Sequence, residues 1–256
     1  MWFGSKTDVA VQQRIHAGRQ WIDAQPNLLA HGRAVCVFEA HARKIDELVE
    51  LLERFNRVYF YLDPKVVKTF MDQIGARGYN TIFALALKGG DDHLKRCAEL
   101  AVPVEQKLPG AKVTVVDDDA SDELVSAIQE FYGAVDLTPQ PAPFIRGYDG
   151  TVVTTVTVGT DGQIIGTSSI HHFRKAGPRL AHVAYSCNTG ILPKFRASGL
   201  ARWQNATAVI EARRRFGFSE VWGNTLPTNG AAIAFHRSLN RAINPAVGYF
   251  WAERAV

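Results

Sequence analysis

The sequence is poor in the residues that stabilise small secreted or metal-binding proteins. Its 256 residues contain three cysteines, Cys36, Cys97 and Cys187, an odd number without CxxC or metal-ligand spacing. This pattern predicts neither a disulfide framework nor a zinc site. We therefore expect a cytoplasmic protein without a bound metal.

Long apolar segments are also missing. The longest apolar runs, such as IFALAL at 82–87, are far shorter than the roughly 20 residues that cross a bilayer. The first residues, MWFGSKTDVAVQQ, lack the apolar core of a signal peptide. We expect no membrane partner.

The charge is only slightly unbalanced. There are 29 Lys and Arg residues against 25 Asp and Glu, a formal net charge of +4, and the basic residues are scattered. Such a balance favours anionic ligands weakly, and we expect no nucleic-acid partner. The basic run at 213–215 precedes Gly217, as cations at a helix C-terminus do, so nucleic-acid binding is the weakest alternative.

The 46% of hydrophobic residues can build a substantial core, and their pattern divides the chain in two. From residue 34 to 102, apolar runs alternate with amphipathic stretches, which predicts three strand–helix pairs. From residue 111, the pattern predicts strand, helix, a proline-rich crossing, a hairpin around GTDG, and then strand, helix, strand, helix, strand. We expect an α/β protein with an N-terminal domain at 1–108 and a second domain at 109–256.

A basic turn with one glycine separates a strand from a helix in the second part. The stretch reads TGILPKFRASGLA, and a long helical pattern begins near Leu200. A helix N-terminus offers unpaired N–H groups and partial positive charge, and glycine lets a phosphate approach the backbone. Lys194 and Arg196 add positive charge. The alternative is that Gly199 marks an ordinary turn.

Five residues around this turn fit the spacing V-x-P-x-x-R-x-x-G-x-A: Ile191, Pro193, Arg196, Gly199 and Ala201. This spacing resembles the acetyl-CoA signature of the GCN5-related N-acetyltransferases (GNAT). The stretch NGAAIAFHRSLN at 229–240 resembles the Asn-x-x-Ala-x-x-x-Tyr helix of that family. The element order from residue 111 is similar as well. The resemblance implies a GNAT-type mixed central sheet flanked by helices.

The resemblance also implies a reaction and a binding site. Acyl-CoA, most simply acetyl-CoA, would lie between the strand before the turn, AHVAYSCNTGIL, and the strand EVWGNTL. We call the first of these the signature strand. An amine acceptor would attack the thioester directly. A backbone N–H of the signature strand would stabilise the oxyanion. The implied cofactor-binding residues are Thr189, Ile191, Leu192, Arg196, Ala197, Ser198, Gly199, Leu200, Ala201, Arg202 and Asn229.

Two departures from the family pattern affect the catalytic residues. The position of the usual tyrosine acid is His236, which could donate a proton near neutral pH or could merely pack or hydrogen-bond. The position where many members carry a carboxylate base is Tyr185, a poor base at its ordinary pKa. His236 and Tyr185 are therefore the candidate catalytic residues, and the base is open. A noncatalytic acyl-CoA-binding or sensor module is the alternative function, and the acceptor and oligomeric state are open.

Two further features are interpreted from the residues alone. The N-terminal part carries no motif of its own; it could be a degenerate second GNAT-like unit, in a tandem that retains one CoA site, and it would shape the acceptor pocket or cover the sheet. The adjacent residues His171 and His172 alternate across a predicted strand, so we interpret them as a solvated strand end, not a metal site.

Overall fold

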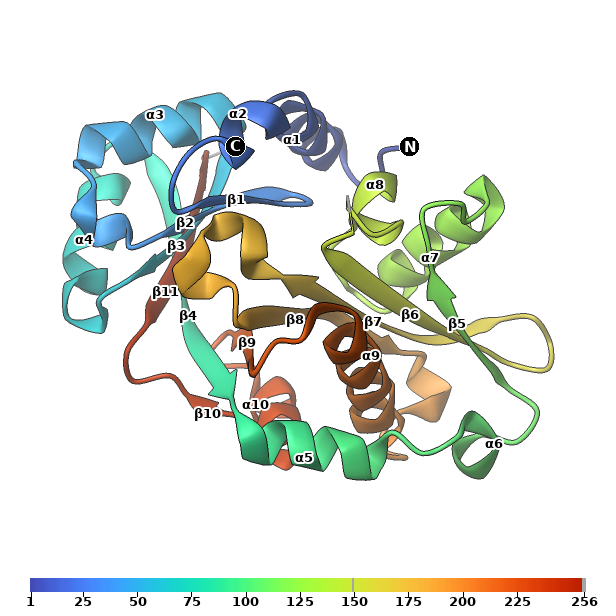
Figure 1. Ribbon diagram of the computed structural model, residues 1–256. Helices are drawn as coiled ribbons and strands as arrows, with labels where there is room; N and C mark the ends of the chain where they lie inside the picture. The colour runs from blue at the N-terminus through green and yellow to red at the C-terminus, as the bar shows by residue number, and fades with distance from the viewer. Residues whose placement is uncertain (149, 255–256) are drawn as a thin grey trace.

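One mixed sheet runs through both parts of the chain (Figure 1). The computed structural model describes residues 1–148 and 150–254. The strand order is β1-β2-β3-β11-β4-β9-β8-β7-β6-β5, with β10 paired to β4. The strands are β1 (Leu28–His31), β2 (Ala34–Phe38), β3 (Arg57–Leu62), β4 (Tyr79–Gly89), β5 (Lys112–Val116), β6 (Val152–Val158), β7 (Ile164–His172), β8 (Val183–Ile191), β9 (Glu220–Thr225), β10 (Ala242–Ile243) and β11 (Gly248–Arg254).

Helices flank this sheet, so the predicted α/β class is confirmed. They are α1 (Lys6–Ala17), α2 (Arg19–Asp23), α3 (Ile45–Phe55), α4 (Val67–Gly75), α5 (Asp91–Leu100), α6 (Val104–Lys107), α7 (Asp122–Ala134), α8 (Ala142–Ile145), α9 (Leu200–Phe216) and α10 (Gly230–Ser238). Among the described residues, no helix combines the length and apolar content that a bilayer crossing requires.

The strands and helices expected from periodicity are present, but α1, α2, β1, α6, α8 and β10 were not predicted. The start of α1 carried a readable signal: the Ser5 hydroxyl accepts a hydrogen bond from the Asp8 N–H, and Asp8 accepts in return from the Ser5 N–H. This reciprocal capping marks a helix N-terminus even where the apolar pattern is weak.

The two halves repeat one arrangement and exchange their last strands. In the first half β1 and β2 form an antiparallel pair, α3 leads to β3 parallel to β2, and α4 leads to β4. In the second half β7, β8, α9, β9, α10 and β11 follow the same order. However, β4 pairs with β9, and β11 pairs with β3 as well as β4. The division at residues 108 and 109 stays a prediction, and this exchange crosses it.

The central strands present an aromatic layer on one face of the sheet. Alternate residues of β3, β8, β9 and β11 contribute side chains to one buried cluster, including Tyr59, Tyr61, Tyr185, Trp222 and Tyr249. A second cluster lies under α9 and includes Ala184 and Val221, which alternate with that layer. The residues of β8 therefore divide between an aromatic side and a helix side.

Candidate active site

Strands β8 and β9 run side by side over only a short stretch and then diverge. Their parallel pairing ends at Tyr185 and Trp222, although β8 continues to Ile191 and β9 to Thr225. The register between β7 and β8 also shifts here, and Asn188, within the shifted stretch, has a left-handed backbone with φ of 50°. A β-bulge bends the strand that carries it, so β8 turns away from β9 at this point.

In the first half, the corresponding strands β2 and β3 do not diverge. Strand β2 pairs with β3 along Val35–Phe38, nearly its whole length. The helix that follows, α3, has Asp46 and Glu47 in its first turn, whereas the first turn of α9 has no acidic residue. Acidic side chains at a helix N-terminus repel an anion. Of the two repeated halves, the second is the one suited to an anionic, extended ligand.

The turn before α9 presents free backbone donors. Gly199, the N-cap, has a φ of 80°, and Ala197 also has a left-handed φ of 60°. Within the described chain, the N–H groups of Ala201 and Arg202 have no hydrogen-bond acceptor. The Nζ of Lys107 on α6 would be 3.7 Å from a Cβ placed on Gly199. The predicted residues 196–202 thus gather at one cationic turn, and Lys107, which sequence reasoning missed, joins them.

Other predicted cofactor residues have structural contacts of their own. Ile191 and Leu200 belong to a buried apolar cluster, and the Leu192 N–H donates to the carbonyl of Ile165. Asn229 caps α10, because its side-chain oxygen accepts a hydrogen bond of 2.9 Å from the Ala232 N–H. The Thr189 hydroxyl lies 2.9 Å from that of Ser168. Their assignment to cofactor binding stays a prediction.

His236 is buried, and its imidazole is uncharged near neutral pH. Burial, and next the nearby Arg241 charge, lower the pKa of His236 to about 3. Its Nδ1 lies 3.4 Å from Nη1 of Arg241, which donates, so the proton of the neutral ring belongs on Nε2. An imidazole with this pKa is not an imidazolium near neutral pH, which favours the hydrogen-bonding alternative over proton donation.

Arg241 is the centre of a buried polar network. Its guanidinium donates to Nε2 of His93 at 3.1 Å and to Oδ1 of Asn205 at 2.9 Å, and burial lowers its pKa to about 10. Asn205 donates in turn to the Ser186 hydroxyl, where β8 and β9 begin to diverge. Among the residues described, no carboxylate pairs with Arg241. The network therefore places a buried cation next to the divergence.

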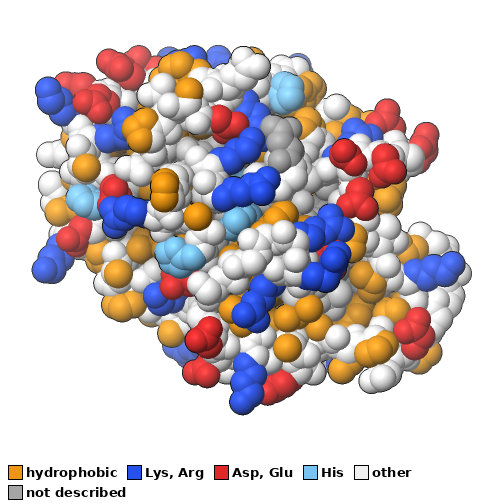
Figure 2. Space-filling model, viewed as in Figure 1, with side chains coloured by type: hydrophobic (Ala, Val, Ile, Leu, Met, Phe, Trp, Pro, Cys, Tyr) orange, Lys and Arg blue, Asp and Glu red, His pale blue; other side chains and the backbone are white. Residues whose placement is uncertain are grey.

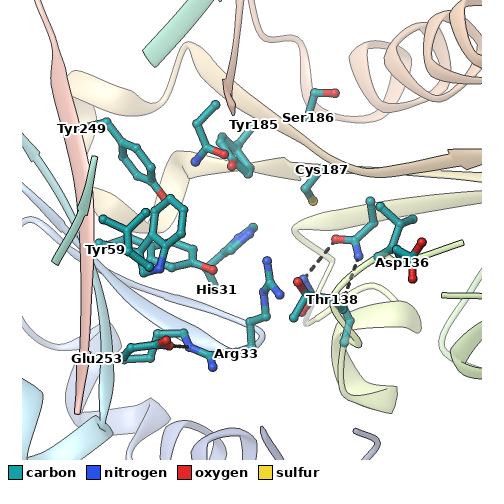
Figure 3. Close-up of a pocket in the computed structure, with 17 residues that line it drawn as sticks. His31, Arg33, Tyr59, Asp136, Thr138, Tyr185, Ser186, Cys187, Tyr249 and Glu253 are labelled. Carbon is teal, nitrogen blue, oxygen red and sulfur yellow. Dashed lines mark hydrogen bonds and ion pairs between the residues drawn. The ribbon is translucent and has the colours of Figure 1, made fainter. Parts of the chain in front are cut away.

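A cavity of about 420 Å³ lies on the face of the sheet opposite α9, against the aromatic layer (Figure 3). Both halves of the chain line it, together with the loop after α7. Its lining includes His31, Arg33, Arg57, Tyr59, Asp136, Thr138, Gln140, Tyr185, Ser186, Cys187, Asn188, Asn224, Tyr249, Trp251 and Glu253. Because Ser186–Asn188 and Asn224 belong to the diverging segments of β8 and β9, the cavity meets the divergence directly.

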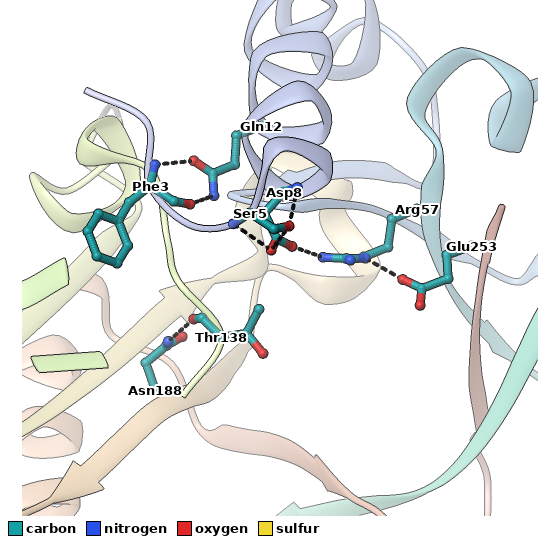
Figure 4. A network of polar contacts seen from close by, with 8 residues as sticks. All are labelled: Phe3, Ser5, Asp8, Gln12, Arg57, Thr138, Asn188 and Glu253. Atoms are coloured by element: carbon teal, nitrogen blue, oxygen red, sulfur yellow. Dashed lines mark hydrogen bonds and ion pairs between the residues drawn. The ribbon is translucent and has the colours of Figure 1, made fainter. Parts of the chain in front are cut away.

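The loop after α7 holds the bulge in place. Asn188 accepts a hydrogen bond of 3.1 Å from Nε2 of Gln140. Its own Nδ2 donates to the carbonyl of Thr138, as Figure 4 shows. Leu137 packs against Gly190, where a Cβ would be 2.6 Å from its Cδ1. The backbone at the divergence is thus fixed from the side of the cavity.

Tyr185 and Cys187 keep their protons. Burial raises the pKa of Tyr185 well above its ordinary value, and raises that of Cys187 to about 12. A thiol with this pKa is a poor nucleophile near neutral pH, so the cavity favours direct attack by a substrate over an acyl-cysteine intermediate. Tyr185 can donate a hydrogen bond but cannot act as a base there.

The interpretation of His171 and His172 as a solvated strand end is wrong. Both are buried: His171 lies against His31 of the first half, whereas His172 stacks on Phe216 and lies 2.8 Å from the carbonyl of Ala181. Nδ1 of His171 lies 2.7 Å from Nδ1 of His31, and burial lowers the pKa of both rings. In residues 1–148 and 150–254, no group of three His, Cys, Asp or Glu side chains is placed to hold a metal ion.

The basic run at 213–215 ends α9, as expected. Arg214 and Arg215 both bind Glu211, and Arg215 also pairs with Asp117 at 3.0 Å. On the face shown in Figure 2, basic side chains are interspersed with acidic and apolar ones.

Comparison with known proteins identifies the second half. Residues 121–240 match the model of the acetyltransferase (GNAT) family. The C-terminal part of the chain is thus similar in sequence to the GNAT family. No curated protein matches the sequence.

Solved structures show that the whole chain shares its fold with GNAT proteins. A GCN5-related N-acetyltransferase from Kribbella flavida aligns with a TM-score of 0.57 at 14% identity, over 96% of each chain. A protein from Novosphingobium aromaticivorans assigned to the GNAT acetyltransferases aligns with a TM-score of 0.56 at 15% identity, over 99% of this chain and 100% of its own. A tandem GNAT protein from clavulanic acid biosynthesis aligns at 0.53 and 16% identity, over 83% and 67%. A tandem relative agrees with the repeated halves seen here.

Proposed function

We propose that the protein is an acyl-CoA-dependent N-acyltransferase, with acetyl-CoA as the donor and an amine as the acceptor. The observation that carries this proposal is the divergence of β8 and β9 between a cationic helix N-terminus and a cavity. Unpaired backbone groups of diverging strands can bind an extended chain such as pantetheine. The GNAT match supports the same ligand.

The residues of the turn fit the pyrophosphate end of the donor. The free N–H groups of Ala201 and Arg202 would bind its oxygens, with Lys107 and Arg196 supplying positive charge. Gly199 keeps the approach open. The free donors support this assignment. Thr189 and Ile191 of β8 would line the path of the donor from the turn to the cavity.

The reaction requires few groups from the protein. When bound, acyl-CoA supplies a thioester carbonyl carbon as the electrophile. The amine lone pair forms the new C–N bond, the C–S bond breaks with its electrons on sulfur, and one proton leaves nitrogen. His236 would donate a hydrogen bond from its neutral Nε2–H towards the sulfur, while Arg241 behind it favours negative charge. Tyr185 keeps its proton and would donate a hydrogen bond from its hydroxyl within the cavity. The departing thiolate takes up a proton from solvent as nitrogen releases one.

A second candidate function is an acyl-CoA-binding sensor without turnover. It is favoured by Tyr185, which occupies the position where the family pattern has a carboxylate base. Calorimetry with CoA and acetyl-CoA, combined with thiol release in the presence of a panel of amines, separates the two. Binding with amine-dependent thiol release supports the enzyme, binding without it supports the sensor, and no binding refutes both.

A further inference from the structure

The cavity at Tyr185 contains one cation and one anion that the described part of the protein does not neutralise, Arg33 and Asp136. We propose that the acceptor is an amino carboxylate, whose carboxylate binds Arg33 and whose ammonium group faces Asp136. The inference rests on the proposed N-acyltransferase function and adds the chemical class of its acceptor.

Arg33 is held close to the bulge of β8 at Asn188. It belongs to the turn of the β1–β2 hairpin, next to Gly32, which has a φ of 55°. A Cβ on Gly32 would be 2.1 Å from Oε1 of Gln140, so the turn packs closely against the residue that binds Asn188. Arg33 and Cys187 line the same cavity, and the Arg33 charge opposes the rise that burial causes in the pKa of Cys187.

Arg33 has no ion-pair partner among the described residues, whereas Arg57 in the same cavity has two. The Nε of Arg33 is buried without a hydrogen bond within the described chain. Arg57 in the same cavity is bound by Glu253 at 2.8 Å and by Asp8 at 3.2 Å (Figure 4). Figure 3 shows Arg33 extending into the space between the aromatic side chains and the Asp136–Thr138 loop. A half-buried guanidinium with a buried, unpaired Nε is a site for a carboxylate.

Asp136 supplies the opposite charge at the other wall. It is exposed at the end of α7, has a left-handed φ of 59°, and forms no ion pair within the described chain. Its neighbours Leu137 and Thr138 contact the bulge of β8. An ammonium group at Asp136 would therefore lie next to the diverging strands. Because an ammonium nitrogen has no lone pair, it first loses one proton to solvent; the Asp136 carboxylate would receive the second proton, which nitrogen loses as the C–N bond forms, and pass it to solvent.

The remaining walls select the rest of the acceptor. Tyr59, Tyr249 and Trp251 line the side of the cavity nearest the N-terminal half. Apolar walls lower the local dielectric and strengthen a guanidinium–carboxylate pair. They also favour an apolar or aromatic substituent, since about 420 Å³ exceeds what glycine would fill. The proposed acceptor is thus an amino acid with an aromatic or large apolar side chain.

Three related compounds test this recognition: L-phenylalanine, phenethylamine, which lacks the carboxylate, and 3-phenylpropionate, which lacks the amine. Calorimetry with the full chain and CoA should show the tightest binding for L-phenylalanine. Arg33→Met should weaken the binding of L-phenylalanine and 3-phenylpropionate about 10- to 100-fold, as loss of hydrogen bonds to a charged group does. It should leave phenethylamine within about threefold. Arg14→Met, which removes an exposed arginine outside the cavity, is the matched control.

Thiol release from acetyl-CoA gives the second readout. Asp136→Asn should lower kcat with L-phenylalanine about 100-fold while changing the binding of 3-phenylpropionate little. If phenethylamine binds and reacts as well as L-phenylalanine, or if Arg33→Met affects all three compounds equally, the inference is overturned while the acyltransferase stands. If CoA itself does not bind, the proposed function has failed. The effect of Arg33→Met on 3-phenylpropionate binding still tests, independently of CoA, whether Arg33 binds a carboxylate. Melting curves of each variant exclude unfolding as the cause.

Discussion

The protonation state of His236 decides how the departing thiolate would be stabilised, and it can be measured through folding. His236 joins His31, His93 and His171 as buried histidines whose pKa is lowered. For His31, His93 and His236 the value falls to about 3, with burial as the largest cause. Well above pH 6.5 these rings are neutral in both folded and unfolded chains. Below it, the unfolded chain takes up protons that the folded chain cannot, so stability falls as the pH falls from 6.5 towards 3.

The expected slope follows from proton uptake. At pH 5.5 an unfolded histidine with the ordinary pKa binds about 0.9 proton, and the buried one binds almost none. Each histidine then contributes about 1.2 kcal/mol per pH unit, and the four together contribute about 5. His236→Gln should therefore reduce the slope of unfolding free energy against pH by about 1.2 kcal/mol per unit between pH 5 and 6, whatever constant stability it loses.

Urea unfolding at several pH values measures this slope. His182→Gln is the control, because His182 is exposed and lies on a loop. Kinetics give a second measurement. Between pH 6 and 8, the pH profile of turnover should have the same shape in the wild type and in His236→Gln, because His236 does not titrate in this range. An unchanged stability slope in His236→Gln, together with a wild-type rate that falls as a group near pH 6.5 deprotonates, would refute the neutral His236 and restore the imidazolium acid suggested by the sequence.

Three further outcomes are expected. Gly199→Glu should abolish CoA binding by calorimetry while the fold persists, because it places a negative side chain at the turn; unchanged affinity would remove the pyrophosphate site from α9. Cys187→Ala should keep turnover within about threefold, since its thiol is protonated, and a loss beyond about 100-fold would indicate a covalent intermediate. Residues 109–256 alone should fail to fold, since β9 and β11 lose their partners β4 and β3; a cooperative melt of that fragment would contradict this dependence.

The sequence by itself determined the local elements and the turn motif that resembles the GNAT family. Apolar periodicity predicted β2 to β4, the hairpin of β6 and β7, and α9, because these patterns depend on neighbours within one element. The spacing from Ile191 to Ala201 showed the resemblance to the GNAT family for the same reason: the motif of this turn consists of residues close together in the sequence. Where helical capping replaced a strong apolar pattern, as in α1, periodicity alone missed the helix.

Only the tertiary structure decided which distant residues meet. The exchange of β4 and β11 joins the halves, and it follows from strand pairing that no local pattern encodes. The same packing buries His171 against His31, and brings Arg33 from a hairpin turn to the bulge at Asn188. Burial also sets the low pKa of His236, because the loss of solvent around a ring depends on what packs over it, which sequence spacing does not record.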